Sequence, residues 1–371
     1  MKRSVSIIGC GFVADLYMAS LKTFPDVAVA CAFDRDPVRM AAFCAHWGIA
    51  PAADINDLLA RTDGIVLNLT NPASHYGVNK ACLEAGRHVY CEKPLAMEFA
   101  QAQELAALAR EKGVMLSSAP CSLLGEAAQM FAKAVRDGVA GDIRLVYVEL
   151  DDGFIPQAPY QSWTSESGAP WPAGDEFAVG CTLEHAGYYL GWMIGTFGSV
   201  RRVVAASAEV LPMKEVTGTP DVSVATLFFE SGLVARLTCS IVAPHDHRIR
   251  AIGDKGVISV NAAWDNGAKV KFRHRLRLRR RLLESPIAQR IKPGGATHPK
   301  VKRRGAASMN FALGPVEMLD AMAENRPCRL SVDLGLHMTE VTLAIQNAGD
   351  KGRAQDMSTR CDPIDPMPWA Q

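Results

Sequence analysis

The chain has 371 residues, of which 49% are hydrophobic and 21% are charged, and its formal net charge is +1. A chain of this length can bury one large core or two ordinary ones, so two domains are the default expectation. The nearly neutral balance argues against nucleic acid as a partner, because binding by counterion release needs a concentrated positive surface.

Targeting and redox signals are weak. The first residues lead directly into a strand-like segment at residues 4–8, and no run is apolar enough for a signal peptide or a membrane span. The ten cysteines are scattered singly, with no Cys/His cluster at zinc spacing, which is typical of reduced, buried thiols. We therefore expect a cytoplasmic protein with no integral membrane segment and no bound metal.

The N-terminal third alternates short β-branched runs with longer amphipathic ones. The runs that predict strands are residues 5–8, 27–33, 65–70, 88–91 and 114–118. The stretches that predict helices are residues 16–24, 37–47, 74–85 and 97–112. Strict alternation of strand and helix predicts an α/β fold with a parallel, doubly wound sheet.

The turn after the first strand reads Gly9-Cys10-Gly11-Phe12-Val13-Ala14, a Gly-x-Gly-x-x-Ala fingerprint. Gly9 permits a tight turn, Gly11 lets the backbone approach a pyrophosphate, and Ala14 allows close packing of helix on strand. We expect Phe12 and Val13 to present their amides to the same phosphates.

Asp34 ends the second predicted strand, twenty residues after Ala14. An acid in this place accepts hydrogen bonds from the adenosine ribose and favours NAD over NADP, whose 2′-phosphate would meet its negative charge. Arg35 follows directly, and its guanidinium could stack on adenine or tolerate that phosphate. The sequence thus predicts NAD and leaves NADP open.

Two further motifs are Leu69-Thr70-Asn71-Pro72-Ala73-Ser74-His75 and, after the fourth strand, Glu92-Lys93-Pro94. With the glycine turn, in this order and spacing, they resemble the Gfo/Idh/MocA family of oxidoreductases over the first 120 residues. The resemblance implies a Rossmann domain at residues 1–121. It also implies an α+β domain at residues 122–371, whose open, mostly antiparallel sheet faces the cofactor and supports a homodimer or homotetramer.

Lys93 lies at the carboxyl end of a parallel strand, beside the crevice where such sheets bind their cofactors. Its ammonium could stabilise the alkoxide that forms as hydride leaves, or donate a proton in the reverse direction. We expect Glu92 and Pro94 to hold it in place, with a cis Lys93–Pro94 bond. The alternative is a solvated lysine at a strand end.

Three other residues are expected near the cofactor at this edge, namely Thr70, Asn71 and His75. A histidine at a helix start is more often a capping or packing residue than a catalyst. We therefore expect His75 only to lie near the cofactor.

Beyond residue 120 a helix at residues 124–136 precedes several strands with short turns, which predict an antiparallel sheet. These strands are residues 143–150, 203–210, 222–230, 233–242, 249–253 and 257–260. The long segment 154–180 is irregular, and loops of this length are often functional. Its Trp163 and Trp171 predict an ordered, substrate-facing loop, because aromatic faces suit the C–H faces of a sugar.

The loop leads into a predicted helix at residues 180–190, which by resemblance carries the second half of the active site. The family has an aspartate followed four residues later by a histidine, on one helical face. Here the matching residues are Glu184 and Tyr188, while His185 points about 100° away on an ideal helix.

Three residues therefore compete for the acid/base role. We favour Lys93 and Tyr188 acting together if the ammonium lowers the phenol pKa, with Glu184 orienting the substrate or the lysine. His185 has an intrinsically suitable pKa and stays an alternative. Tyr188 could also merely pack.

Residues 269–304 contain fourteen Lys or Arg and one acid, Glu284, and residues 269–277 alternate with period two. This pattern predicts a strand with one cationic face, either a solvated edge strand or a subunit interface. An anion-binding surface is the alternative. His337 and Glu340, one helical turn apart, indicate helix packing because no third metal ligand is visible.

The leading hypothesis is an NAD(P)-dependent oxidoreductase that moves a hydride between the nicotinamide and a hydroxyl carbon of a sugar, sugar derivative or cyclitol. A second is an NAD-dependent glycoside hydrolase or lyase that uses transient oxidation. A third is a non-catalytic dinucleotide-binding regulator on the same fold.

Overall fold

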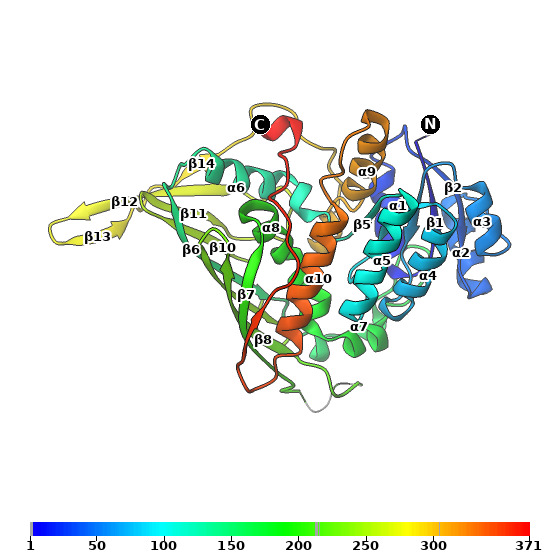
Figure 1. Ribbon diagram of the computed structural model, residues 1–371, viewed down its shortest axis with the longest axis horizontal. Helices are drawn as coiled ribbons and strands as arrows, with labels where there is room; N and C mark the ends of the chain where they lie inside the picture. The colour runs from blue at the N-terminus through cyan, green and yellow to red at the C-terminus, as the bar shows by residue number, and fades with distance from the viewer. Residues whose placement is uncertain (1–2, 212–213, 215, 304) are drawn as a thin grey trace.

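The computed structural model describes residues 3–211, 214, 216–303 and 305–371, and these residues form two β-sheets (Figure 1). The first sheet is parallel, with strand order β2-β1-β3-β4-β5. Its strands are β1 (Ser4–Ile8), β2 (Ala28–Phe33), β3 (Ile65–Asn68), β4 (His88–Cys91) and β5 (Leu116–Ser118). The predicted doubly wound parallel sheet is confirmed.

Helices cover both faces of this sheet because its strands are apolar on both sides. Val5 and Ile7 of β1 share a core with α1 and α2, whereas Ile8 packs with α3, α4 and α5. The helices are α1 (Phe12–Leu21), α2 (Pro37–Trp47), α3 (Ile55–Arg61), α4 (Pro72–Glu84) and α5 (Phe99–Lys112). The short helix α3 was not predicted, and α1 begins four residues earlier than predicted, directly after the glycine turn.

The second sheet has ten strands, nine of them in the order β13-β12-β11-β10-β6-β9-β8-β7-β15, with β14 beside β12. All neighbours in it are antiparallel except β6 and β9, which are parallel. The predicted mostly antiparallel sheet is thus confirmed. Short turns between strands predict antiparallel pairing, but a long connection that contains α7 and α8 joins β6 to β7. Such a connection allows β6 to pair in parallel with β9.

Five helices accompany the strands of this second sheet. The strands are β6 (Ile143–Asp151), β7 (Val200–Ala208), β8 (Val222–Phe229), β9 (Val234–Ser240), β10 (Ile249–Gly253), β11 (Gly256–Val260), β12 (Val270–Leu278), β13 (Arg281–Glu284), β14 (Gln289–Ile291) and β15 (Ala354–Asp356). The helices are α6 (Glu126–Arg136), α7 (Ala173–Val179), α8 (Gly187–Phe197), α9 (Leu313–Glu324) and α10 (Val332–Gln346).

The C-terminal helices connect the two sheets, and α10 lies between them (Figure 1). The Ser117 hydroxyl donates to the Leu330 carbonyl at 2.7 Å, and Arg110 of α5 pairs with Asp333 of α10. Gly314 of α9 lies against the Tyr90 ring with no space for a Cβ atom. The predicted boundary after residue 121 falls between the two sheets, but residues near 314–333 also pack on the first one.

Strands β12 and β13 form a hairpin that projects beyond the second sheet (Figure 1). The strand predicted at residues 269–277 is confirmed. From His274 to the end of β13 every residue is exposed, including Leu278 at 62% and Leu282 at 64%. Arg275 and Arg277 alternate along this part of the strand with Leu276 and Leu278, so the cations still share one face, and both faces lie in solvent.

All ten cysteines lie in the described ranges, and all are free. Eight are buried, while Cys328 and Cys361 are partly exposed. None of the helices in the described part of the chain has the length and hydrophobicity that a bilayer-spanning segment needs.

Candidate active site

The turn between β1 and α1 is shaped by two glycines with different constraints. Gly9 has a φ of +96°, and a Cβ there would lie 2.6 Å from the Leu69 carbonyl. Gly11 is the N-cap residue of α1, and a Cβ there would meet nothing within 4 Å. No side chain caps this helix, so no cap competes for the first amides of α1, such as those of Phe12 and Val13, which suits an anion.

Asp34 follows β2, and its side chain is only 6% exposed. Its carboxylate accepts hydrogen bonds from the amides of Cys10 and Asp36, each at 2.8 Å, which fixes it beside the glycine turn. The guanidinium paired with Asp34 is that of Arg39, at 3.8 Å, in the first turn of α2. The sequence analysis named Arg35 as the cation beside this acid, because it follows Asp34 directly. No feature of the sequence indicated Arg39.

His75 joins the two motif loops at the carboxyl edge of the sheet. It is fully buried, with Nδ1 2.6 Å from the Pro94 carbonyl and Nε2 2.9 Å from the Thr70 carbonyl. Burial lowers the pKa of His75 despite these two acceptors. The side chain thus holds the Lys93–Pro94 turn against the Thr70 turn, as expected of a packing histidine.

Lys93 is held by contacts to both its backbone and its side chain. The Glu92 carboxylate accepts from the Tyr17 hydroxyl at 2.6 Å and from the Lys93 amide at 3.1 Å, and the Lys93–Pro94 bond is cis, as predicted. The Lys93 ammonium forms an ion pair with Glu184, and these side chains are 16% and 3% exposed. A solvated lysine at a strand end is therefore excluded.

The charge state of Lys93 follows from its neighbours. Burial lowers the pKa of this ammonium, but the carboxylates of Glu184 and Glu176 more than offset that effect, and the pKa lies well above its usual range. Lys93 is thus a permanent cation at neutral pH. It can stabilise a developing negative charge but cannot serve as a base.

Glu176 of α7 is a third ionisable residue beside Lys93 and Glu184, and the sequence analysis did not identify it. Its part-buried carboxyl hydrogen-bonds to Glu184, and both burial and the charge of Glu184 raise its pKa well above the usual range. Two carboxyls beside one ammonium cannot both ionise cheaply, so the pair holds a proton. Glu176 lies in the irregular segment 154–180, where no periodicity signals its position.

Glu184 lies on a π-helical turn, Thr182–Ala186, rather than on the ideal α-helix assumed from the sequence. Such turns are frequent at functional sites. Tyr188 follows on α8 and is buried, with its ring centroid 4.3 Å from that of Trp264, another residue that was missed. The two residues that match the family pattern thus lie at one site.

The condition set for Tyr188 as acid or base, a phenol pKa lowered by Lys93, is not met. Lys93 acts in that direction, but burial and the carboxylates raise the pKa more, so the net shift is upward. The physical reason is that a phenolate in this buried place would lose its water and face three acidic residues. Tyr188 therefore stays a neutral hydroxyl.

His185 points to a different partner. Its Nδ1 lies 3.1 Å from the Cys181 carbonyl and its Nε2 lies 3.2 Å from an oxygen of Asp152, the residue after β6. Burial lowers the pKa of His185, although Asp152 opposes that effect. Glu184 and His185 are thus adjacent in the chain, but Glu184 contacts Lys93 whereas His185 contacts Asp152.

Segment 154–180 is ordered and attached to the first domain. The Ser167 hydroxyl donates to Asp15 of α1 at 2.7 Å, and the Asn71 amide donates to Asp175 at 3.4 Å. Trp171 lines a small pocket with Glu176 and His185, and Trp163 packs edge-on against Trp171 with centroids 5.3 Å apart. Trp171 thus lies closer to the charged group than Trp163 does.

The two halves of the site meet where a parallel sheet binds a dinucleotide and where a second domain covers its carboxyl edge. The start of α1, which no side chain caps, and the buried acid after β2 fit a dinucleotide. Fold and site together define the class of nucleotide-binding oxidoreductases.

Comparison with known families identifies the particular group. Residues 3–119 match the model of the NAD-binding Rossmann domain of an oxidoreductase family, and residues 128–259 match the GFO/IDH/MocA C-terminal domain. The chain belongs to the Gfo/Idh/MocA family of oxidoreductases, and the resemblance found in the sequence is confirmed.

Individual relatives agree with this assignment. The oxidoreductase YfiI of Bacillus subtilis is 30% identical over 56% of the chain, an alignment that spans about half (53%) of that relative's own length. Mouse trans-1,2-dihydrobenzene-1,2-diol dehydrogenase is 25% identical over 70% of the chain and 74% of the relative.

Among solved structures, the UDP-N-acetylglucosamine 3-dehydrogenase GnnA from Acidithiobacillus ferrooxidans superposes with a TM-score of 0.70 at 19% identity, covering 93% of this chain and 97% of its own. An inositol dehydrogenase homologue from Azotobacter vinelandii gives 0.74 at 17% identity, covering 95% and 97%. These likenesses concern the fold.

Proposed function

We propose that the chain is an NAD(P)-dependent dehydrogenase or reductase acting on a hydroxyl carbon of a sugar, a sugar derivative or a cyclitol. The observation that carries this proposal is the buried ion pair of Lys93 with Glu184, joined by Glu176. The cofactor, when bound, supplies the hydride acceptor or donor. Lys93 binds the substrate oxygen and stabilises its negative charge, and the two carboxyls accept or return the proton.

The cofactor site of this proposal uses the predicted residues. The turn from Gly9 to Val13 binds the pyrophosphate and Asp34 binds the ribose, which favours NAD. Arg39 partly neutralises Asp34, so NADP is the second cofactor to test. Of the other predicted residues, Thr70, Asn71 and Pro94 belong to the turns that border this site, and His75 and Glu92 hold those turns in place.

The substrate side is aromatic as well as charged. Tyr188 and Trp264 lie together near Lys93, and Trp171, with Trp163 behind it, borders Glu176. Aromatic faces suit the apolar faces of a ring, while the Lys93 group binds a hydroxyl. Two of the similar proteins are named as dehydrogenases of a dihydrodiol and of a UDP-sugar, which supports this substrate class.

The test combines two readouts on purified protein, namely NADH or NADPH absorbance and glycoside cleavage, against sugars, cyclitols, nucleotide sugars and aryl glycosides. Stoichiometric reduction of added NAD by one substrate class is the expected result. Cleavage without net NADH would overturn it.

A glycoside hydrolase or lyase is the second candidate because of the Glu176 and Glu184 pair. A carboxyl that keeps its proton to an unusually high pH can protonate a leaving oxygen. The third candidate, a non-catalytic regulator, offers no reason for a buried Lys93 ion pair. The same panel separates all three.

The protein's setting is also part of the proposal. We propose that it acts in the cytoplasm as a homodimer or homotetramer formed through the second sheet. Val224 on β8 is 47% exposed, which suits a surface for a second copy. The basic hairpin is a further candidate for subunit contact.

A further inference from the structure

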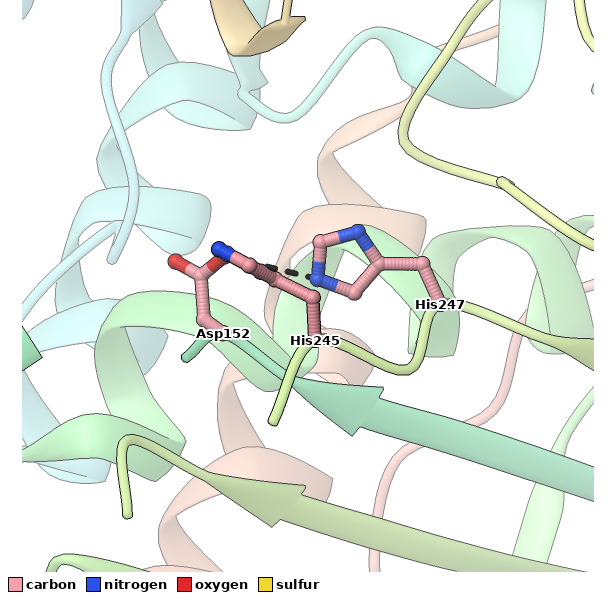
Figure 2. Close-up of side chains that lie close together, drawn as sticks. All are labelled: Asp152, His245 and His247. Carbon is pink, nitrogen blue, oxygen red and sulfur yellow. Dashed lines mark ion pairs between the residues drawn. The ribbon is translucent and has the colours of Figure 1, made fainter. Parts of the chain in front are cut away.

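Three imidazoles surround Asp152 beside the candidate active site. Asp152 follows β6, and His245 and His247 lie on the segment that leads into β10. Figure 2 shows the side chains of Asp152, His245 and His247 converging, and one ligand atom from each lies within 4.8 Å of the others. His185 approaches the same carboxylate from the π-helical turn.

The backbone makes room for this arrangement. Gly153 has a φ of +76°, and a Cβ there would lie 2.8 Å from Nε2 of His245, so the ring rests directly on the glycine. The amides of Asp151 and Asp246 each donate to the other's carbonyl at 3.0 Å, which ties the two segments together. The Asp246 carboxylate is itself paired with Arg248, so it does not compete for the imidazoles.

The distances around one oxygen of Asp152 suit the ligands of a single ion. Nε2 of His247 and Nδ1 of His245 lie 3.3 and 3.6 Å from Oδ1 of Asp152, whereas Nε2 of His185 lies 3.2 Å from Oδ2. A tetrahedral ion with bonds of about 2.1 Å separates its ligand atoms by about 3.4 Å.

A buried nitrogen without a hydrogen-bond partner also favours a cation here. Nε2 of His247 is buried and forms no hydrogen bond within the described residues, although it lies 3.3 Å from the Asp152 carboxylate. A cation held between the two would satisfy both.

We propose that Asp152, His245 and His247 bind one divalent transition-metal ion of the Zn²⁺ type, with the fourth position open. Imidazole-rich sites with one carboxylate select such ions over Mg²⁺ or Ca²⁺, which prefer oxygen ligands. His185 lies on the other oxygen of the Asp152 carboxylate and stands outside this set of ligands. The expectation of no metal gives way to this proposal.

The ion would lie next to the groups proposed to react, Lys93 and Glu184. His185 adjoins Glu184 in the chain. The centroid of the Trp264 ring lies 5.5 Å from that of His247 and 4.3 Å from that of Tyr188. The metal site itself does not depend on the proposed function, because its evidence is the geometry around Asp152.

The test is a titration of tag-free, chelator-stripped full chain with Zn²⁺ in competition with a chromophoric indicator. One equivalent per chain is expected to bind. His247→Gln and His245→Gln should weaken binding by at least about 10-fold. The matched control is His274→Gln, on the exposed hairpin, which should bind like wild type.

Two results would overturn the proposal: wild type that takes up no stoichiometric Zn²⁺, or cluster variants that bind like the His274→Gln control. His245 is 69% exposed, so its substitution should leave the fold intact even if a variant at Asp152 does not fold. Circular dichroism of each variant checks this. Activity with NAD is a separate readout, so failure of either proposal leaves the other testable.

Discussion

The two halves of the candidate site are held by different kinds of interaction. In the cofactor half, Gly9 fits a turn with no room for a side chain, and the His75 ring lies between two backbone carbonyls. In the substrate half, Lys93, Glu184 and Glu176 hold one another by charge. Substitutions in the first half should therefore act through backbone geometry, and those in the second through protonation.

The largest effect is expected where the halves meet. Lys93→Ala should lower kcat/KM at least about 10³-fold, a loss of about 4 kcal/mol, because it removes the only ammonium placed to stabilise the substrate oxygen among the residues described at the site. Steady-state kinetics with the substrate found in the panel measures it.

Lys80→Ala is the matched control, because this lysine pairs with Glu104 on the exposed surface. It should keep wild-type kinetics. Binding of NADH, followed by fluorescence, shows whether Lys93→Ala still forms the cofactor site. A Lys93→Ala enzyme within 10-fold of wild type would revive the regulator hypothesis.

The contrast between the halves also explains what the sequence could predict. Gly9, Asp34 and Lys93 follow strands within short motifs, so their positions in a parallel sheet follow from local spacing. Glu176 and Trp264 reach the site from an irregular segment and from beyond β11, and no periodicity places them. The residues of the substrate half can therefore be identified only from the three-dimensional structure.

The pKa of Tyr188 shows the same limit. Its neighbour Lys93 was predicted correctly, but the sign of the pKa shift depends on burial and on Glu176, which only the structure gives. The π-helical turn likewise replaced the ideal helix on which the angle of His185 was based. For the Asp152 group, the one available signal was the pair His245 and His247, two residues apart before a strand.

The second prediction concerns the glycine turn, where one glycine is needed for backbone conformation and the other for close approach of the cofactor. Gly9→Ala should destabilise the protein by about 3 kcal/mol, because its φ is +96° and its Cβ would strike the Leu69 backbone. Gly11→Ala has open space and should change stability by less than about 0.5 kcal/mol. It should still weaken NADH binding by at least about 10-fold, because the methyl group occupies the place of the pyrophosphate.

Denaturant unfolding and NADH titration measure the two quantities. If Gly11→Ala bound NADH like wild type, the pyrophosphate would not lie over this turn. Equal loss of stability in both variants would mean that strain alone governs the turn.

The smallest predicted effect is a shift in a pH profile. The Glu176 and Glu184 pair holds a proton to a higher pH than an ordinary carboxyl, so oxidation should gain activity as the pH rises through this raised pKa. Glu176→Gln removes the like charge, and the rising limb of kcat/KM should move to lower pH by about one unit.

The control is Glu111→Gln, an exposed carboxyl near the end of α5. Its pH profile should match that of wild type. Coincident profiles for Glu176→Gln and wild type would show that the carboxyl pair takes no part in the proton transfer.

The buried cysteines have a consequence for how opening of this chain can be followed. Burial raises the pKa of Cys82 and of Cys121 to about 12, so almost no thiolate is present in the native state at neutral pH. Alkylation of these thiols should therefore proceed at the pace of local unfolding, which makes the labelling rate at each a native-state measure of opening free energy. Cys10 lies inside the glycine turn, next to Asp34, so its protection reports on the cofactor edge without any added probe.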